Sequence, residues 1–343
     1  MRIAVDGRHL TGGRGIARYL RSMLDAWAVI APEDELALAS GGRSTFAAAA
    51  LAGRPRLDRM TVGGDVVWAP APAPLAVSPG VPFVLTVHDL SWTHRPEDFT
   101  AYERLWHRLA RIPELARRAD RVITDAQATV GDIVERWGIA PERVVVVQPG
   151  PGLSPAPTPG GVERPDLSAM ADKSGRSPYF LAVGALEPRK APDVLVRAHA
   201  LARSQGLRAD LVFAGAGRVA VAGDGVRIVT PGDEELAALY AGALAVVHPA
   251  WLEGFAFAPI EGLVHGTPAI VADLPLYDET IGEGALRFAP GDEAGLAHAM
   301  LRLERAPDLR AQLVRTGQTA IAPLSWQRAA RETRAVLAAA ARR

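Results

Sequence analysis

Short apolar runs alternate with longer amphipathic segments along almost the whole chain. Runs such as 179–183 and 245–247 are apolar on both faces, as strands of a parallel sheet are when helices cover them. This alternation predicts α/β architecture with doubly wound parallel sheets. The expected strands are 2–5, 83–88, 121–124, 143–147, 179–183, 210–214, 226–229, 245–247 and 268–272, with helices at 15–29, 127–137, 193–204 and 233–241.

A proline-rich stretch at 148–178 divides this series into two halves of similar size. Its prolines, glycines and polar residues are typical of a linker, and 343 residues suffice for two domains. We therefore predict one domain over 1–165 and a second over 166–326, with a final helix, capped by Ser325, over 327–343. Ligands of such folds bind at the carboxyl ends of the strands, so we expect a cleft between the domains.

Charge and cysteine content exclude several classes of protein. Lys plus Arg total 38 and Asp plus Glu total 38, so no basic field indicates a nucleic-acid partner. The absence of cysteine excludes disulfides, thiolate zinc sites and a cysteine nucleophile. Prolines interrupt the longest uncharged stretch, 66–87, so we expect no membrane-spanning helix there. The first residues lack the apolar core of a secretory signal peptide. We therefore expect a cytoplasmic protein.

Two polar motifs follow strands of the first half. Gly12, Gly13 and Gly15 precede a helix, where glycines let the backbone approach a ligand and free N–H groups attract an anion. The spacing matches neither a dinucleotide fingerprint nor a P-loop, so an ordinary turn stays an equal alternative. His88 ends an apolar strand, where it could contact a sugar hydroxyl. A histidine satisfied by the local backbone is the more common case.

The second half carries the stronger motifs. Arg189 and Lys190 are adjacent cations after a strand, an arrangement that suits a diphosphate, and Lys190 is one of only two lysines. Glu253 is expected in a loop, and Glu261 in the first turn of a helix that starts at Pro259. Two such carboxylates can accept hydrogen bonds from a sugar ring and a ribose. A glycosidase pair, or a glutamate that complements the helix dipole, is the alternative. The histidine spacings predict no metal site.

Taken in order, these motifs resemble glycosyltransferase family 4, the retaining nucleotide-sugar transferases of GT-B fold. The resemblance extends from the glycine loop over VLTVHDLSWTHRPEDF (84–99), ADRVIT (119–124), YFLAVGALEPRK (179–190) and DEELAALYAGA (233–243). Its most diagnostic part is HPAWLEGFAFAPIEGLVHGTPAIVAD (248–273), which holds the family's paired glutamates. The resemblance implies two Rossmann-like domains that face each other across a cleft, with a C-terminal helix that crosses back to the first.

The resemblance also implies roles for individual residues. Arg189 and Lys190 would hold the donor diphosphate and stabilise the leaving nucleotide, the task of a metal ion in other transferase folds. Glu253 would bind donor-sugar hydroxyls and Glu261 the ribose. The remaining implied donor contacts are the N–H groups of Gly254, Phe255 and Ala256, the pocket glycines Gly184 and Gly215, Asp233 near the base, Gly13 and Gly15 at the phosphates, and His88 beside the reacting centre.

Four places depart from the family pattern. Ala256 stands where EGFG has its second glycine, Ala191 where asparagine is common, Asp125, Ala126 and Gln127 where valine, serine and glutamate are typical, and Ala250 where serine usually follows the proline. The first departure predicts a tighter sugar pocket, and the third weakens the inherited first-domain contacts. None of them touches the donor cations or the paired glutamates.

The predicted function is transfer of a hexose, mannose first, from GDP-mannose or a UDP-hexose to a hydroxyl of a glycan or lipid-linked acceptor. We expect retention, an alpha linkage and no cofactor or metal. The alternatives are a non-catalytic nucleotide-sugar-binding protein and a GT-B sugar-nucleotide epimerase. Residues 102–118 combine Trp106 and Leu109 with five arginines, which predicts a basic amphipathic helix that could rest on the inner membrane face. A solvated surface helix is the more common alternative.

Overall fold

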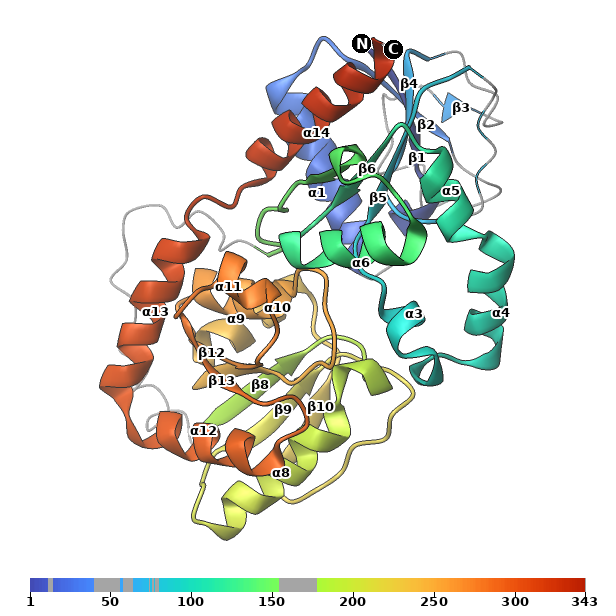
Figure 1. Ribbon diagram of the computed structural model, residues 1–343. Coiled ribbons are helices and arrows are strands. Elements are labelled where there is room, and N and C mark those ends of the chain that lie inside the picture. The colour runs from blue at the N-terminus through green and yellow to red at the C-terminus, as the bar shows by residue number, and fades with distance from the viewer. Residues whose placement is uncertain are drawn as a thin grey trace. The chain divides into compact units, whose positions relative to one another are not determined.

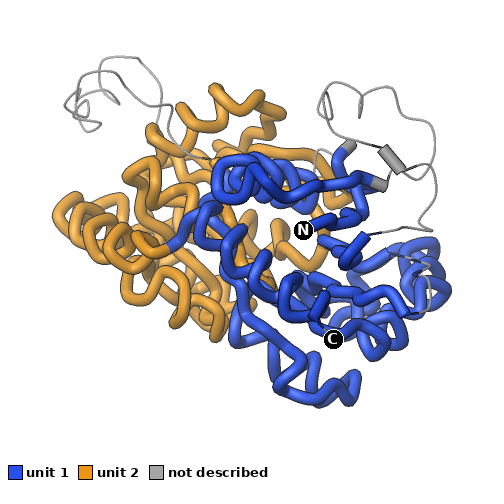
Figure 2. The backbone as a smooth tube through the Cα atoms, turned by 90° about the horizontal axis from the view of Figure 1, so that it is seen from above, with its two compact units in different colours: residues 1–152, 324–343 blue, residues 153–323 orange. Residues whose placement is uncertain are grey.

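The computed structural model divides into two compact units, each with its own parallel sheet (Figure 2). Unit 1 consists of Met1–Gly152 and Leu324–Arg343, and unit 2 of Leu153–Pro323. The predicted boundary after residue 165 lies outside the described residues and stays a prediction. The structure describes residues 1–11, 15–39, 56–57, 64–73, 75, 77, 80–153 and 178–342.

The sheet of unit 1 has the strand order β3-β2-β1-β4-β5-β6-β7, and every neighbouring pair is parallel. Successive side chains of a strand face opposite sides. Val84 accordingly packs in the core with α1, whereas Leu85 packs in the core with α5 and α6. Burial on both faces explains the apolar runs. The strands are β1 (Arg2–Asp6), β2 (Glu35–Ala39), β3 (Arg56–Leu57), β4 (Val66–Ala69), β5 (Phe83–Val87), β6 (Arg121–Thr124) and β7 (Val144–Val146).

The C-terminal helix of the chain belongs to unit 1. Helix α14 begins after Ser325, whose hydroxyl accepts a hydrogen bond from the Arg328 N–H at 3.2 Å. It packs along α1, where Leu337 shares a buried core with Trp27, and this confirms the predicted return of the tail (Figure 1). The helices of unit 1 are η1 (Arg8–Thr11), α1 (Gly15–Ile30), α3 (Ser91–His94), η2 (Pro96–Asp98), α4 (Ala101–Ala110), α5 (Ile112–Arg118), α6 (Gln127–Trp137), η3 (Pro141–Arg143) and α14 (Trp326–Ala341).

The single helix predicted over 102–118 is wrong. The chain forms α4 and α5, separated by Arg111 in a left-handed conformation with φ of 47°. Pro113 lies in the first turn of α5, where its missing N–H costs nothing, but the same residue could not donate inside a continuous helix.

Unit 2 has the strand order β10-β9-β8-β11-β12-β13, again with parallel neighbours. No helix in the described part of the chain is both long and apolar enough to cross a membrane. The elements are β8 (Tyr179–Val183), η4 (Pro188–Lys190), α8 (Pro192–Ser204), β9 (Asp210–Ala214), β10 (Val226–Val229), α9 (Asp233–Gly242), β11 (Ala245–His248), α10 (Phe257–Val264), β12 (Ala269–Ala272), α11 (Leu276–Thr280), β13 (Ala285–Phe288), α12 (Glu293–Arg305) and α13 (Pro307–Ile321).

Helix α10 starts earlier than the sequence predicts. It begins at Phe257 instead of Pro259, so Glu261 lies in its second turn and not in its first. Proline has a fixed φ and lacks a backbone N–H. It is tolerated anywhere in the first turn of a helix because the N–H groups there have no partner within the helix. Pro259 therefore marks the start of α10 only to within two residues.

Candidate functional site

The carboxyl ends of β8 and β9 lie very close together. Gly184 has φ of 135° and Gly215 has φ of 148°, conformations that L side chains rarely adopt. A Cβ atom on Gly215 would lie 2.1 Å from the carbonyl oxygen of Gly184. Both glycines are thus required by the backbone itself, and Gly184 also lines a pocket at this edge of the sheet.

That pocket opens where β8 and β11 end. Lys190 and His248 contribute its polar side chains, and the rest of its wall is mostly backbone and apolar groups. The lining residues are Ala182, Val183, Gly184, Ala185, Leu186, Lys190, Pro192, Leu195, Phe213, Val247, His248 and Pro249.

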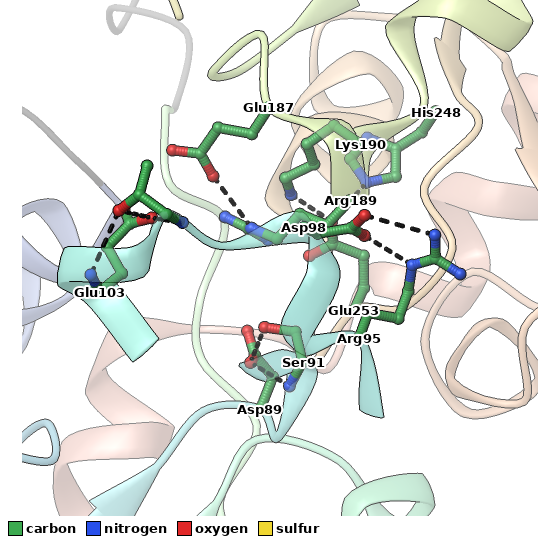
Figure 3. Close-up of polar contacts among 11 residues, drawn as sticks. Asp89, Ser91, Arg95, Asp98, Glu103, Glu187, Arg189, Lys190, His248 and Glu253 are labelled. Atoms are coloured by element: carbon green, nitrogen blue, oxygen red, sulfur yellow. Dashed lines mark hydrogen bonds and ion pairs between the residues drawn. The ribbon is translucent and has the colours of Figure 1, made fainter. Parts of the chain in front are cut away.

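Short turn η4 carries the two predicted donor cations. The Arg189 Nε donates to Glu187 Oε2 at 3.0 Å, and the Arg189 carbonyl accepts from the Trp251 N–H at 3.0 Å. The latter bond ties this turn to the loop that carries Glu253. The next residue, Lys190, points its ammonium group to Glu253 (Figure 3).

The carboxylate of Glu253 receives two donors on one oxygen. Lys190 Nζ and His248 Nε2 both donate to Glu253 Oε1, the latter at 3.1 Å (Figure 3). Burial alone would raise the pKa of Glu253, because its side chain is only 8% exposed. The ammonium of Lys190 and the hydrogen bond from His248 outweigh burial and hold this pKa well below the ordinary value. Glu253 is therefore a charged, oriented acceptor at neutral pH.

His248 itself is neutral at neutral pH. Burial is the largest effect and lowers the pKa of the imidazole, although the neighbouring Glu253 acts in the opposite direction. A carboxylate can only accept, so the His248 proton sits on Nε2. None of the sequence motifs predicts a role for His248. Its place directly before Pro249 and the Glu253 loop was the available signal.

Glu261, the other predicted carboxylate, lies in a separate contact network. Its side chain is buried on α10, and Tyr240 of α9 donates its hydroxyl to Glu261 Oε2 at 2.5 Å. The ring of Tyr240 stacks on His265, with ring centroids 5.3 Å apart. Tyr240 therefore holds one oxygen of Glu261, a contact that no local motif indicates because 20 residues separate the two positions.

The segment between the two glutamates is buried. Gly254, Phe255 and Ala256 precede α10, and Ala256 has a left-handed backbone with φ of 62°. Phe255 packs edge-to-face on Phe257 at 5.1 Å between ring centroids. Asp233 lies in the exposed first turn of α9, next to Gly232.

In unit 1, His88 is engaged at both ring nitrogens. Nδ1 contacts Asp125 Oδ2 at 2.7 Å, and Nε2 donates to the Pro70 carbonyl at 2.9 Å. Burial lowers the pKa of His88, but the Asp125 carboxylate and the Pro70 carbonyl outweigh it and the pKa is raised. These partners are a carboxylate 37 residues away and a carbonyl 18 residues away, so the local backbone of the alternative interpretation does not satisfy His88, and a catalytic role stays a prediction. Asp125, noted only as a departure from the family pattern, supplies the partner.

The two remaining predicted glycines lie near the start of α1. Gly15 is the first residue of the helix and is exposed. Gly13 lies outside the described residues. Among the residues that the structure does describe, no three histidine, aspartate or glutamate side chains gather in a way that could hold a metal ion.

Two family models match the chain, one in each half. "Glycosyltransferase Family 4" matches residues 16–151, and "Glycosyl transferases group 1" matches residues 177–305. A D-inositol 3-phosphate glycosyltransferase of Salinispora arenicola is 30% identical over 281 residues, which are 73% of this chain and 61% of that protein. The O-antigen chain mannosyltransferase RfbU of Salmonella typhimurium is 26% identical over 240 residues, 65% of this chain and 61% of that protein. The chain thus spans about three fifths of the length of these relatives.

A solved structure resembles the whole chain. HepE of Anabaena, crystallised in complex with UDP-glucose, has a TM-score of 0.71 at 16% sequence identity, with 99% of this chain and 100% of that chain covered. At this identity the likeness concerns the fold, and it confirms the predicted GT-B fold of two Rossmann-like units.

Proposed function

Because the chain belongs to the glycosyltransferases of family 4 and group 1, we propose that it transfers a hexose from a nucleotide diphosphate sugar to a hydroxyl group. The acceptor is a glycan or a glycolipid. The reaction proceeds with retention, forms an alpha linkage and needs no metal ion.

One observation carries this proposal. Lys190 and Glu253 come from loops 63 residues apart and meet at the edge of the sheet where β8 and β11 end, beside the pocket. Ligands of open parallel sheets bind at this edge. A diphosphate needs fixed cations, and a hexose needs fixed hydrogen-bond acceptors. Lys190 and Glu253 lie next to each other, as the diphosphate and the hexose do in a nucleotide sugar.

In the reaction, the bond between the anomeric carbon and the donor phosphate oxygen breaks. The acceptor oxygen bonds to the same carbon on the same face, and its proton passes to an oxygen of the leaving diphosphate. Lys190 and Arg189 stabilise the negative charge that develops on that diphosphate. Glu253 holds the sugar hydroxyls so that the anomeric carbon stays in place.

Mannose is the first candidate for the hexose, and a UDP-hexose the second. RfbU of Salmonella is named a mannosyltransferase, which supports GDP-mannose. HepE of Anabaena was crystallised with UDP-glucose, which supports a uridine donor. In this proposal unit 2 holds the nucleoside, with Asp233 near the base and Glu261 at the ribose.

The first test is a thermal-shift panel with GDP, UDP, ADP and dTDP, each with and without magnesium. Stabilisation by one nucleotide, equal with and without magnesium, is the expected result. The matching sugar nucleotide is then offered with and without acceptors, because an epimerase would convert it without any acceptor. No stabilisation by any nucleotide at millimolar concentration would favour a non-catalytic protein with a degenerate donor site.

A surface of α4 favours a lipid-linked acceptor. Of the large apolar side chains exposed in the described residues, three lie on this helix: Tyr102, Leu105 and Leu109, which are 75%, 51% and 69% exposed. At about 100° per residue they form one stripe, with Arg108 about 60° from Leu105. Figure 1 shows α4 at the periphery of unit 1, farther from the sheet than α5. We propose that this stripe rests on an anionic bilayer, with Arg108 at the headgroups.

Vesicle sedimentation tests the stripe. The wild type is expected to bind phosphatidylglycerol-containing vesicles at least about 10-fold more tightly than pure phosphatidylcholine vesicles, and the double variant Leu105→Gln/Leu109→Gln to lose this binding. Val29→Gln is the matched control, since Val29 is 71% exposed but lies on α1. Equal binding to both kinds of vesicle would remove the proposal, and so would a dimer of the wild type that the double variant abolishes.

A further inference from the structure

The proposed reaction uses Lys190 and Glu253 but not His248, although His248 contacts the same carboxylate. It ends β11, is almost fully buried and lines the same pocket as Lys190. Its Nε2 lies 3.1 Å from Glu253 Oε1, the oxygen that Lys190 also contacts (Figure 3). Glu253 Oε1 thus has two hydrogen-bond donors, Lys190 and His248, and their contributions differ when a ligand binds.

A bound nucleotide sugar would affect these two hydrogen-bond donors differently. Lys190 is a flexible, charged side chain, and a diphosphate competes with Glu253 for its ammonium group. His248 is neutral and is held by the end of a buried strand. Once Lys190 turns to the diphosphate, Glu253 would be a buried carboxylate without its cation, a costly arrangement unless another hydrogen bond remains.

We infer that His248 is a positioning residue for the donor sugar: its Nε2–H keeps Glu253 Oε1 bonded when Lys190 moves to the diphosphate, and leaves Oε2 free for the sugar hydroxyls. This inference rests on the proposed function. It assigns to His248 the recognition of the hexose and leaves recognition of the nucleotide to other groups. The loss of His248 should therefore weaken binding of a sugar nucleotide but not of the nucleoside diphosphate alone.

Calorimetry with matched ligand pairs separates recognition of the hexose from recognition of the nucleotide. The probes are UDP-glucose with UDP, and GDP-mannose with GDP, each titrated into the wild type, His248→Leu and His248→Gln. His248→Leu removes the donor, whereas the amide N–H of His248→Gln reaches about as far as Nε2. We expect His248→Leu to weaken the sugar nucleotide about 10-fold and the nucleoside diphosphate less than about twofold. His248→Gln should restore the sugar nucleotide to within about threefold of the wild type.

His199→Leu is the control for a purely structural loss. His199 is also a buried histidine of unit 2, and its Nε2 lies 2.9 Å from the Ala209 carbonyl. Because Ala209 precedes β9, this contact lies at the edge of the parallel sheet opposite the pocket. His199→Leu should lower the melting temperature and leave the ratio of the two affinities unchanged.

The outcomes distinguish this inference from the function on which it rests. If the wild type binds a pair but His248→Leu weakens both members equally, or neither, the positioning role is wrong and the donor site stands. A His248→Gln variant no better than His248→Leu would likewise contradict the hydrogen bond. If the wild type binds none of the four probes and no nucleotide of the thermal-shift panel, the proposed function itself fails and the role of His248 fails with it.

Discussion

At the residue scale, two alanines occupy backbone conformations that suit other residues. Ala191 has φ of 49° and Ala256 has φ of 62°, and both are buried. They are also two of the positions at which the sequence departs from the pattern of family 4, which has asparagine and glycine there. The left-handed region costs an ordinary L residue roughly 1–2 kcal/mol, whereas glycine and asparagine tolerate it. The pattern of the family therefore has a backbone reason at these positions.

Replacement of Ala256 by glycine should stabilise the protein. The relief of the left-handed strain exceeds the entropy that glycine adds to the unfolded chain, so we expect a gain of about 0.5–1 kcal/mol in the free energy of unfolding. Urea denaturation of Ala256→Gly measures this gain. Ala258→Gly is the control: Ala258 is the second residue of α10 and has no left-handed strain to relieve, so glycine should instead lower stability, by up to about 1 kcal/mol. A loss of stability in Ala256→Gly would show that the methyl group packs better than its backbone suggests.

Lys190 should matter far more for turnover than Arg197, a cation on the following helix α8. Lys190→Ala removes the point charge beside the leaving diphosphate, and kcat/KM should fall by on the order of 3 kcal/mol, about 100-fold. Arg197→Ala is the control, because Arg197 is half-exposed on α8 and pairs with Asp193 and Glu293. Near-wild-type kcat/KM of Lys190→Ala with saturating acceptor would contradict the assignment to the leaving group.

At the scale of elements, the carboxylate of Asp34 ties α14 to the rest of unit 1. The pattern of apolar residues does not predict this contact. The Arg334 Nε donates to Asp34 Oδ2 at 2.6 Å, and the indole of Trp27 donates to the same oxygen at 3.2 Å. Burial raises the pKa of Asp34, but the hydrogen bonds from Arg334, the ammonium group of Met1 and Trp27 outweigh it and lower the pKa to about 2. Helix α14, α1 and the turn before β2 thus share one carboxylate.

This carboxylate predicts a pH dependence of stability. The pKa of Asp34 is lower in the folded than in the unfolded protein, so its contribution is fully present above pH 4 or so and is lost as the pH falls towards about 2. Asp34→Asn should cost on the order of 1 kcal/mol at neutral pH and flatten the acid limb of a melting-temperature profile. The control is Glu33→Gln, since Glu33 also pairs with Arg334 but is 64% exposed. Parallel acid limbs for Asp34→Asn and the wild type would contradict the assignment.

At the scale of the whole molecule, the last 20 residues belong to unit 1 although the chain reaches them through unit 2. Helix α14 covers a face of α1 formed by Leu20, Met23 and Trp27. Truncation after Pro323 would expose that face and should destabilise unit 1 while unit 2 stays folded.

Hydrogen exchange resolves this prediction by unit. The truncated chain should show faster exchange in α1 and β1 and unchanged exchange in β8 and β11. Removal of only Arg342 and Arg343 is the control, because α14 ends at Ala341. Equally accelerated exchange in both units would mean that the tail stabilises the protein as a whole.

Much of the local structure could be predicted from the sequence. The strands at 121–124, 179–183, 210–214 and 226–229 and the helix at 127–137 have the bounds that their apolar pattern predicts. The strands that were missed, β2, β3, β4 and β13, are two to five residues long. Of these, β4 is followed at once by a proline-rich stretch, and Arg287 interrupts the apolar run of β13. Length alone does not explain the misses, because the correctly predicted strands also have four or five residues. The missed segments have a weaker local pattern, and their pairing in the sheet defines them.

The sequence by itself determined the α/β class, the two-domain order and the motifs that hold Arg189, Lys190, Glu253 and Glu261, because periodicity and motif spacing are local properties. Only the tertiary structure decided what these groups contact. It brought Lys190 and His248 to one oxygen of Glu253. It also bonded the Tyr240 hydroxyl to Glu261, and it placed the ring of His88 between Asp125 and the Pro70 carbonyl. Such contacts depend on which strand ends a parallel sheet places side by side, and that order is set by packing over the whole unit.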